Sequence, residues 1–544
     1  RDLHSFPTRR SSDLIALNYH KQALSKLQSL DDLAAVAVAY QGMGDALLKL
    51  RQYPLALENY ELAWPSLQEL EDKQSLGNLY TNIAEVLENL ERENLAIAFY
   101  KQALKTQPEN ASIDRKLAGL LLQSDRLPEA QEVLELIKIK ELEDYLGTVN
   151  SNNENLGVFN LLPAEEQIFE EETENLLEIE LETEDLRATN LQVFNNLQEK
   201  LRRLPGSVVL YPLILDDRLE LVLFKSNGTA VRKRVEVTEE ELKRAIANFR
   251  SVVASPIGNV ERPAEQLYEW LIEPLENDLL QANAETIIYL PDSHLRYLPL
   301  AGLYDGDKWL IERFNINNIA AASLTEFDEK DNNSPRVLAA GLSEGGYDLE
   351  VGEQEVSLIA TNGELVENFE EIIPGATTLL DEEFTPEAVV GNLGDRNILH
   401  LDTTVALVTA EAGKNKPEDS FILFANGERL TLRDLESWSL ENLDLVVLSA
   451  VETNLGSDMG NGEEIAAFGY QMQRAGVEAI VTSLWRVDEE AVEEFMKTFY
   501  SVLQEGKSTA QALRETQIAM ITKEGRYGGS PHYWAQFVLM GNGF

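Results

Sequence analysis

The sequence of 544 residues contains no cysteine. This absence excludes disulfides, zinc sites built on thiolates and any thiol nucleophile. Basic residues are scarce as well, since 46 Lys and Arg stand against 94 Asp and Glu, which gives a formal charge of −48. Such an acidic surface repels phosphate backbones and anionic lipid, so we expect neither nucleic acid nor a membrane as a partner.

Long apolar runs are also missing, and none approaches the roughly 18 residues of a membrane-spanning helix. Apolar residues still make up 44% of the chain, enough for two or three domains with their own cores. These features predict a cytoplasmic protein. Residues 1–14, RDLHSFPTRRSSDL, resemble an in-frame translation of a sequencing adapter, and we expect them to be an artefact.

An internal repeat follows that segment. Seven positions of one unit recur 40 residues later, and a weaker third copy comes next. Small residues in this spacing let two antiparallel helices approach closely, and neighbouring pairs stack into a superhelix. The three copies hold Tyr40, Met43, Gly44, Leu47, Ala56, Tyr60 and Ala63; Tyr80, Ile83, Ala84, Leu87, Ala96, Tyr100 and Ala103; and Leu117, Ala118, Leu121, Ala130 and Leu134.

This pattern resembles the tetratricopeptide repeat over residues 15–145. Ahead of the first full copy, Ala16 and Ala23 match only the second helix of a unit, so the arm is expected to be truncated at its start. The repeats imply a concave surface that binds a protein or peptide partner. Another α-solenoid would imply the same function.

Residues 146–205 read as an acidic linker and a connecting helix. Between Glu165 and Asp185 there are 11 acidic residues and no Lys or Arg. This run could attract a basic partner, or it could be the solvated face of a connector, and we favour the second interpretation. Helical apolar spacing then leads into the next domain, at Leu191, Phe194, Leu197 and Leu201.

From residue 206 to residue 544, short β-branched runs alternate with amphipathic helices. Val208–Leu215 and Leu219–Lys225 predict a hairpin. Strands that alternate with helices predict an α/β domain with a mostly parallel sheet, whose function gathers at the carboxyl ends of the strands. Four continuously apolar runs predict buried strands, at Arg336–Leu342, Asn397–Thr403, Leu443–Ala450 and Ala479–Trp485.

Several motifs of this domain follow one another as they do in the CHAT family, caspase-like domains associated with tetratricopeptide repeats. They include PDSHLRYLPLAGLYDGDKWLIERFNI, NILHLDTTVAL, LDLVVLSAVETNLG and PHYWAQFVLMGNG. The chain resembles this family over about residues 205–544 and in its repeat arm. The resemblance implies a caspase/separase-like fold, whose active members are cysteine peptidases of the His–Cys type.

In active relatives the base is the second His of an H-x-A-T-H-G motif, and the nucleophile is the Cys of L-S-A-C-E-T. This sequence reads HLDTTV, which puts Thr404 at the base and Val405 at the following Gly. It reads LSAVET at the nucleophile, where Val451 stands. Valine has no lone pair, and a threonine hydroxyl is too weak a base near pH 7, so we expect no peptidase activity. The branched Val405 would also crowd an oxyanion donor.

Five neighbours of these positions complete the vestigial site: His400, Asp402, Ser449, Glu452 and Thr453. His400 lies four residues before Thr404, about 13 Å along a strand, so it reads as a core histidine rather than a base. The loop residues Asp458, Glu463 and Glu464 could attract a basic side chain, although a solvated acidic loop is the simpler interpretation. A single His532 among scattered carboxylates is not metal-ligand spacing, so neither metal nor cofactor is expected.

These features favour a pseudoprotease scaffold or signalling adaptor that binds a protein through its repeats. The alternative is a hydrolase with a rearranged site and a hydroxyl nucleophile, Ser449 or Thr453. A degenerating paralogue with no function beyond folding is a third possibility.

Overall fold

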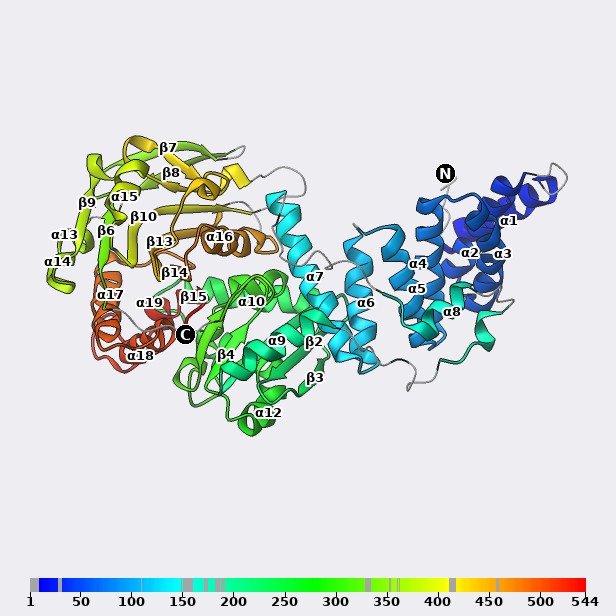
Figure 1. The fold of residues 1–544 in the computed structure, drawn as a ribbon, viewed down its shortest axis with the longest axis horizontal. Coiled ribbons are helices and arrows are strands. Elements are labelled where there is room, and N and C mark those ends of the chain that lie inside the picture. The colour runs from blue at the N-terminus through cyan, green and yellow to red at the C-terminus, as the bar shows by residue number, and fades with distance from the viewer. Residues whose placement is uncertain are drawn as a thin grey trace, which may run out of the picture. The chain divides into compact units, whose positions relative to one another are not determined.

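The computed structural model describes residues 9–27, 32–108, 110–147, 149, 160–170, 175–181, 186, 191–327, 334–351, 354–359, 361, 363–409, 417–455 and 459–544. The chain divides into two compact units. The repeat unit comprises Arg1–Ile137 and Asn153–Phe194, and the sheet unit comprises Lys138–Asn152 and Asn195–Phe544. The boundary falls within helix α7, and the segment predicted as a connector, 146–205, is divided between the units (Figure 1).

Helices joined by short turns build the repeat unit. They are α1 (Arg9–Leu27), α2 (Leu33–Lys49), α3 (Tyr53–Glu69), α4 (Lys73–Asn89), α5 (Glu93–Thr106), α6 (Ala111–Gln123) and α7 (Leu127–Leu146). A Cβ on Gly44 would lie 2.3 Å from the ring of Tyr60, so only glycine allows α2 and α3 to approach this closely. The predicted helical pairs and the role of their small residues are confirmed.

The described part of the connector contains α8 (Pro163–Glu170), the 3-10 turn η1 (Leu176–Glu178) and α9 (Gln192–Arg203). Helix α9 confirms the helical spacing predicted from Leu191 to Leu201. The expectation of a solvated acidic face is wrong for Glu165, which is fully buried between Lys101 and Arg126. A run of acidic residues predicts that most of its members are exposed to solvent. It does not identify the member that is buried, because the cations that pair with a buried carboxylate are distant in sequence.

Thirteen of the described strands form one sheet in the order β12-β11-β10-β13-β14-β15-β5-β4-β1-β2-β3, with β6 beside β10 and β9 beside β6. Their bounds are β1 (Ser207–Leu215), β2 (Arg218–Lys225), β3 (Ala230–Val235), β4 (Thr286–Tyr289), β5 (Asn315–Asn318), β6 (Val337–Gly341), β9 (Thr377–Leu380), β10 (Ile398–Val408), β11 (Phe421–Leu423), β12 (Arg429–Thr431), β13 (Leu445–Leu455), β14 (Ala479–Ser483) and β15 (Phe537–Gly541). A separate hairpin joins β7 (Gly346–Val351) to β8 (Gln354–Ile359).

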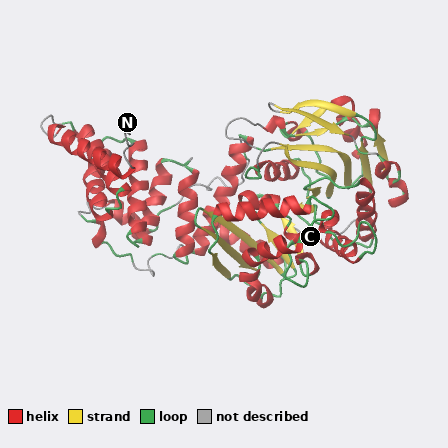
Figure 2. Ribbon diagram, turned by 180° about the vertical axis from the view of Figure 1, so that it is seen from behind, coloured by secondary structure: helices red, strands yellow, loops and turns green. Residues whose placement is uncertain are grey.

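The middle of the large sheet is mostly parallel, as predicted, and antiparallel strands flank it. The predicted hairpin is confirmed by the antiparallel pair β1 and β2. Helices cover both faces of the sheet (Figure 2). They include α10 (Glu239–Val253), α11 (Glu261–Leu271), α12 (Glu276–Gln281), α13 (Glu364–Glu367), α14 (Phe369–Ile372), α15 (Pro386–Leu393), α16 (Glu463–Arg474), α17 (Glu489–Gln504), α18 (Thr509–Thr522) and α19 (Pro531–Trp534).

Two strands run further than the sequence suggested. The predicted strands ended at Thr403 and Ala450, whereas β10 continues to Val408 and β13 to Leu455. The two strands pair in parallel along this extension. Residues 404–408 of β10 and 451–455 of β13 were expected beyond the strand ends, but their backbone pairs within the sheet.

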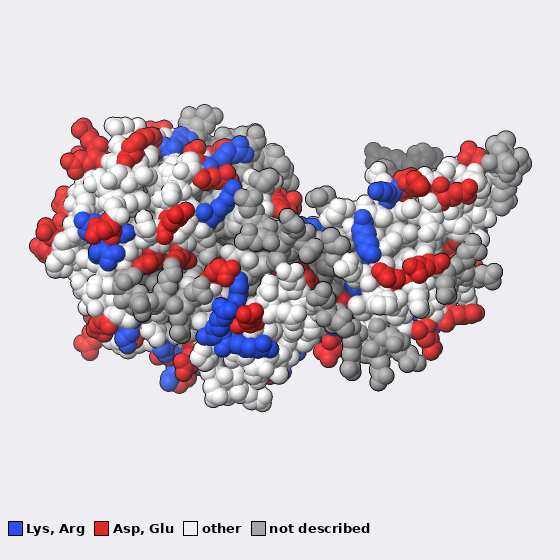
Figure 3. All heavy atoms as spheres, viewed as in Figure 1, with Lys and Arg blue, Asp and Glu red and all other residues white. Residues whose placement is uncertain are grey.

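None of the helices in the described residues is long and apolar enough to cross a membrane. Acidic side chains are spread over the face shown in Figure 3, and basic side chains lie singly or in small groups among them.

Candidate functional site

The two positions that we expect to decide peptidase chemistry lie on neighbouring strands. In the parallel pairing of β10 with β13, Thr404 is opposite Ala450 and Val405 is opposite Val451. The register shifts between Leu401 and Thr404, so β10 carries one extra residue there, as a β-bulge does. The backbone thus brings positions 404 and 451 together, one residue out of register.

The described side chains at this point are closed off from solvent. Thr404 is 1% exposed and Val405 is fully buried. The side chains of residues 451–455 and the whole of Asp458 lie outside the described residues, so Glu452 and Thr453 are placed by backbone only, opposite Ala406 and Leu407.

Asp402 is the centre of a buried hydrogen-bond chain beside the bulge. Ser449 Oγ donates to Asp402 Oδ1 over 2.6 Å, and Thr361 Oγ1 lies 3.0 Å from Asp402 Oδ2. Burial raises the pKa of Asp402, and the hydrogen bonds from Ser449 and Thr361 only partly offset this rise. Thr361 also donates to Leu342 O over 2.7 Å. Because a hydroxyl has one proton, a protonated Asp402 that donates to Thr361 satisfies every group in this chain.

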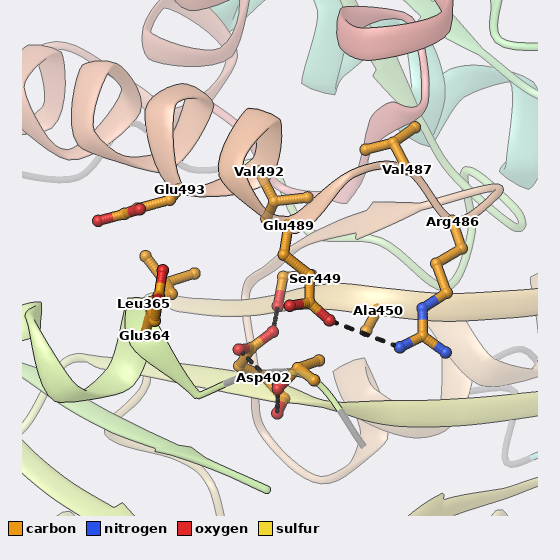
Figure 4. Close-up of a pocket in the computed structure, with 11 residues that line it drawn as sticks. Glu364, Leu365, Asp402, Ser449, Ala450, Arg486, Val487, Glu489, Val492 and Glu493 are labelled. Carbon is orange, nitrogen blue, oxygen red and sulfur yellow. Dashed lines mark hydrogen bonds and ion pairs between the residues drawn. The ribbon is translucent and has the colours of Figure 1, made fainter. Parts of the chain in front are cut away.

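A small pocket opens over Asp402 and Ser449 (Figure 4). Arg486 and Glu489 form an ion pair of 3.8 Å across it. Its volume of about 20 Å³ is room for about one water molecule. A peptide substrate does not fit such a space. The carboxylates that line it in addition to Asp402 are Glu364, Glu489 and Glu493.

His400 is a core residue of the sheet. Its ring is fully buried, its Nδ1 lies 2.9 Å from the Tyr500 hydroxyl, and Phe369 packs on it. Burial lowers the pKa of His400 to about 3, so its imidazole is neutral at pH 7. Its register partner on β13 is Val447, two residues before Ser449.

We predict that His400 reacts with diethyl pyrocarbonate at least tenfold more slowly than the partly exposed His20 in the folded protein, because the reagent cannot reach a buried ring. Peptide mass spectrometry of a time course measures both rates. Unfolding in urea should make them equal. Modification of His400 at the rate of His20 in the native protein would show an accessible imidazole.

The other described histidines of the sheet unit are held elsewhere. Ser293 Oγ pairs with His294 Nδ1 over 2.9 Å, and His532 Nδ1 lies 2.9 Å from Val253 O. Ser449 is hydrogen-bonded to a carboxylate and not to an imidazole. Within the described residues, no group of three metal-ligating side chains occurs.

The interpretation of Asp458, Glu463 and Glu464 as a solvated acidic loop is wrong for Glu464, which lies in the first turn of α16. Glu464 is fully buried and accepts a hydrogen bond from the Tyr297 hydroxyl, so its carboxylate faces the protein interior. Burial raises the pKa of Glu464 to about 7. Burial also raises the pKa of Glu463, and Glu141 adds to the rise.

Sequence reasoning missed Thr361 and Arg486, which complete the surroundings of Asp402. Thr361 is distant from Asp402 in the sequence and belongs to no motif, so its contact with Asp402 could not be predicted from the sequence. Arg486 directly follows the predicted strand Ala479–Trp485, and that strand pattern carries no sign of a contact near Asp402. Asp488 is the N-cap residue of α17, but its side chain makes no capping hydrogen bond.

Among solved structures, two of the Saccharomyces cerevisiae separase–securin complex are similar to this chain. One aligns with a TM-score of 0.40 and 10% sequence identity over 99% of this chain, and the other with 0.37 and 9% over 96%. The chain spans about half the length of the matched chains, 50% and 48%. None of the curated proteins compared with the sequence matches it.

Two family models match the sequence itself. The tetratricopeptide repeat matches residues 91–144, which include α5, α6 and most of α7. The CHAT domain matches residues 261–542, more than half of the chain. The motifs that suggested the CHAT family lie within this range, apart from the last residue of the final one. The chain therefore belongs to the CHAT family and carries tetratricopeptide repeats ahead of its CHAT domain.

Proposed function

We propose that this protein is a pseudoprotease scaffold that binds a protein partner through its repeats and does not cleave peptide bonds. The observation that carries the proposal is the pairing of β10 with β13. It brings together the two positions where active relatives hold imidazole and thiol, and here these positions are Thr404 and Val451. A thiolate and a nearby base are both required for cysteine peptidase chemistry.

The burial of positions 404 and 405, the repeat unit and the net charge all support the proposal. The extension of β10 and β13 buries Thr404 and Val405 inside the sheet, where a substrate carbonyl has no access. The repeat unit offers helical surfaces of the kind that bind peptides. A formal charge of −48 supports a protein partner over nucleic acid. A cytoplasmic location remains a prediction from composition.

A hydroxyl hydrolase is the second candidate, and one contact favours it. Ser449 Oγ lies 2.6 Å from Asp402 in a pocket, as a nucleophile lies beside its base. Two features weaken this candidate: Ser449 is 3% exposed, and the pocket holds about one water.

We predict no cleavage above the uncatalysed background when the purified chain is incubated with a proteome-derived peptide library, read by mass spectrometry. A matched control is the chain with Thr404→His, Val405→Gly and Val451→Cys, which restores the residues of active relatives. Cleavage by that chain alone would assign the inertness to these three positions.

Turnover by the wild-type chain that is lost on Ser449→Ala would overturn the proposal in favour of the hydrolase. Labelling of Ser449 by a fluorophosphonate probe in the native protein would point the same way. For the scaffold function, a pull-down with the full chain should retain a specific partner, and substitutions in the repeat unit should release it.

A further inference from the structure

Residues 160–170 and 175–178 pack against the repeat unit, where they contact α3, α4, α5 and the turn residues Arg92 and Arg126. Helix α8 carries Glu165, Ile168 and Phe169 at the i, i+3 and i+4 spacing that places side chains on one face. Glu165 and Ile168 are 0% and 3% exposed. The segment therefore lies on the arm as an amphipathic helix lies in a groove.

Glu165 is held by two cations of the arm. Its carboxylate lies 2.9 Å from Lys101 Nζ and 2.8 Å from Arg126 Nη2, and it accepts the Leu162 N–H over 2.8 Å. Glu129 contacts the same two cations, so the four side chains are neutral together. Without Glu165, two buried cations would face one carboxylate. This position therefore selects an anion.

Phe169 is the second anchor, and it packs against three aromatic rings of the arm. Its ring centroid lies 5.0 Å from Phe99 and 5.8 Å from both Trp64 and Tyr80, in the edge-on geometry that aromatic pairs favour. The Trp64 indole N–H also donates to the Tyr80 hydroxyl over 3.2 Å, which fixes two of these rings. The cluster is thus a preformed seat for an aromatic side chain.

The main chain beyond α8 is recognised as well. Glu61 Oε1 accepts the Leu176 N–H over 2.7 Å, and Arg92 Nη2 donates to Leu177 O over 2.6 Å. Side chains that pair with the backbone groups of an added segment are typical of peptide-binding surfaces. We call the site formed by Trp64, Tyr80, Phe99, Lys101 and Arg126 the arm groove.

We propose that the arm groove is the partner site of the repeats, and that residues 160–170 and 175–178 are its built-in occupant. The partner is a short amphipathic helix that presents a carboxylate and, four residues later, an aromatic ring. This inference rests on the proposed scaffold function. It places the site on α3, α4, α5 and the turn before α7, whereas the sequence suggested only a concave surface.

The covalent link between α8 and the repeat unit explains how the arm groove stays occupied in the absence of a partner. A linked segment competes at an effective concentration on the order of millimolar, so a free helix of equal affinity binds poorly until the linked one is displaced. Removing the two anchors of the linked segment should therefore increase the affinity for a free helix without any new contact.

The test uses the full chain and a fluorescein-labelled peptide of residues 160–170, followed by fluorescence anisotropy. The opened chain carries Glu165→Ala and Phe169→Ala. Its matched control carries Glu166→Ala and Glu170→Ala, which remove exposed carboxylates from the same helix. We expect the opened chain to bind the peptide at least tenfold more tightly than the wild type and the control. Adding Lys101→Met to the opened chain should abolish that gain.

A second measurement does not depend on the opened chain. Saturating unlabelled peptide added to the wild type should increase deuterium uptake in α8, because the free helix displaces it. A peptide with Glu165→Gln and Phe169→Ala should have no such effect. Equal binding by the opened and wild-type chains, or equal binding of both peptides, would overturn the inference. Neither result bears on cleavage, so the pseudoprotease proposal is tested separately.

Discussion

Replacing Asp292 by alanine is expected to destabilise the sheet unit by about 3–5 kcal/mol. Asp292 is fully buried, and its Oδ1 lies 2.8 Å from Lys138 Nζ on the end of α7. Its Oδ2 accepts the Ile214 N–H of β1 over 2.9 Å. The substitution leaves Lys138, whose side chain is 2% exposed, as a buried cation that has lost its carboxylate at 2.8 Å, while Glu141 lies 3.9 Å away.

Urea unfolding followed by tryptophan fluorescence measures this change, because five of the six tryptophans lie in the sheet unit. The control is Glu199→Ala, which removes an exposed ion pair with Arg203 and should change the free energy of unfolding by less than about 1 kcal/mol. Equal effects of the two substitutions would mean that the buried pair contributes no more than a surface pair.

The same stretch has a structural role that is separate from the proposed loss of peptidase chemistry. Asp292 and Arg296 both stand in the motif that begins at Pro291. Arg296 donates to Glu141 of α7 and to Asn461 O just ahead of α16. The motif thus joins the end of α7 to the sheet unit, a structural task that does not depend on Thr404 or Val451.

Elements with a strong period could be predicted from the sequence. Helices α10 and α17 are two of the amphipathic helices expected between the strands, and each buries one stripe of apolar side chains. Strand β5 could not be predicted, since its sequence NINN has low strand propensity. It forms because β4 pairs with it along its length and β15 pairs at its end, in the middle of the sheet.

The candidate site was predictable in part. The adjacency of positions 404 and 451 follows from two buried parallel strands, but the bulge that offsets them depends on tertiary packing. The burial of Glu165 was missed for a similar reason, because the cations that hold it are 64 and 39 residues away in the chain. Local composition carries no information on such a contact.

Replacing Glu464 by glutamine is expected to stabilise the protein above pH 7 and to have little effect near pH 5. Glu464 is buried, Tyr297 donates to its Oε1, and its Oε2 has no hydrogen-bond partner among the described residues. Burial raises its pKa from 4.5 to about 7, while Arg296 opposes the rise and Glu463 adds to it. The folded protein therefore keeps a proton that the unfolded chain loses.

The sign of the effect follows from this difference in bound protons. Between about pH 4.5 and 7 the folded state binds more protons, so the contribution of Glu464 to the free energy of unfolding falls as pH rises. At about 1.4 kcal/mol per pKa unit, the total fall is about 3 kcal/mol. Glutamine cannot ionise, and its amide oxygen can still accept from Tyr297. Urea unfolding of both chains at pH 5, 6, 7 and 8 isolates the contribution, because the remaining carboxylates are common to both. The exposed substitution Glu240→Gln should give a nearly constant difference, and a constant difference for Glu464→Gln would mean that this carboxyl is already ionised in the folded protein at pH 5.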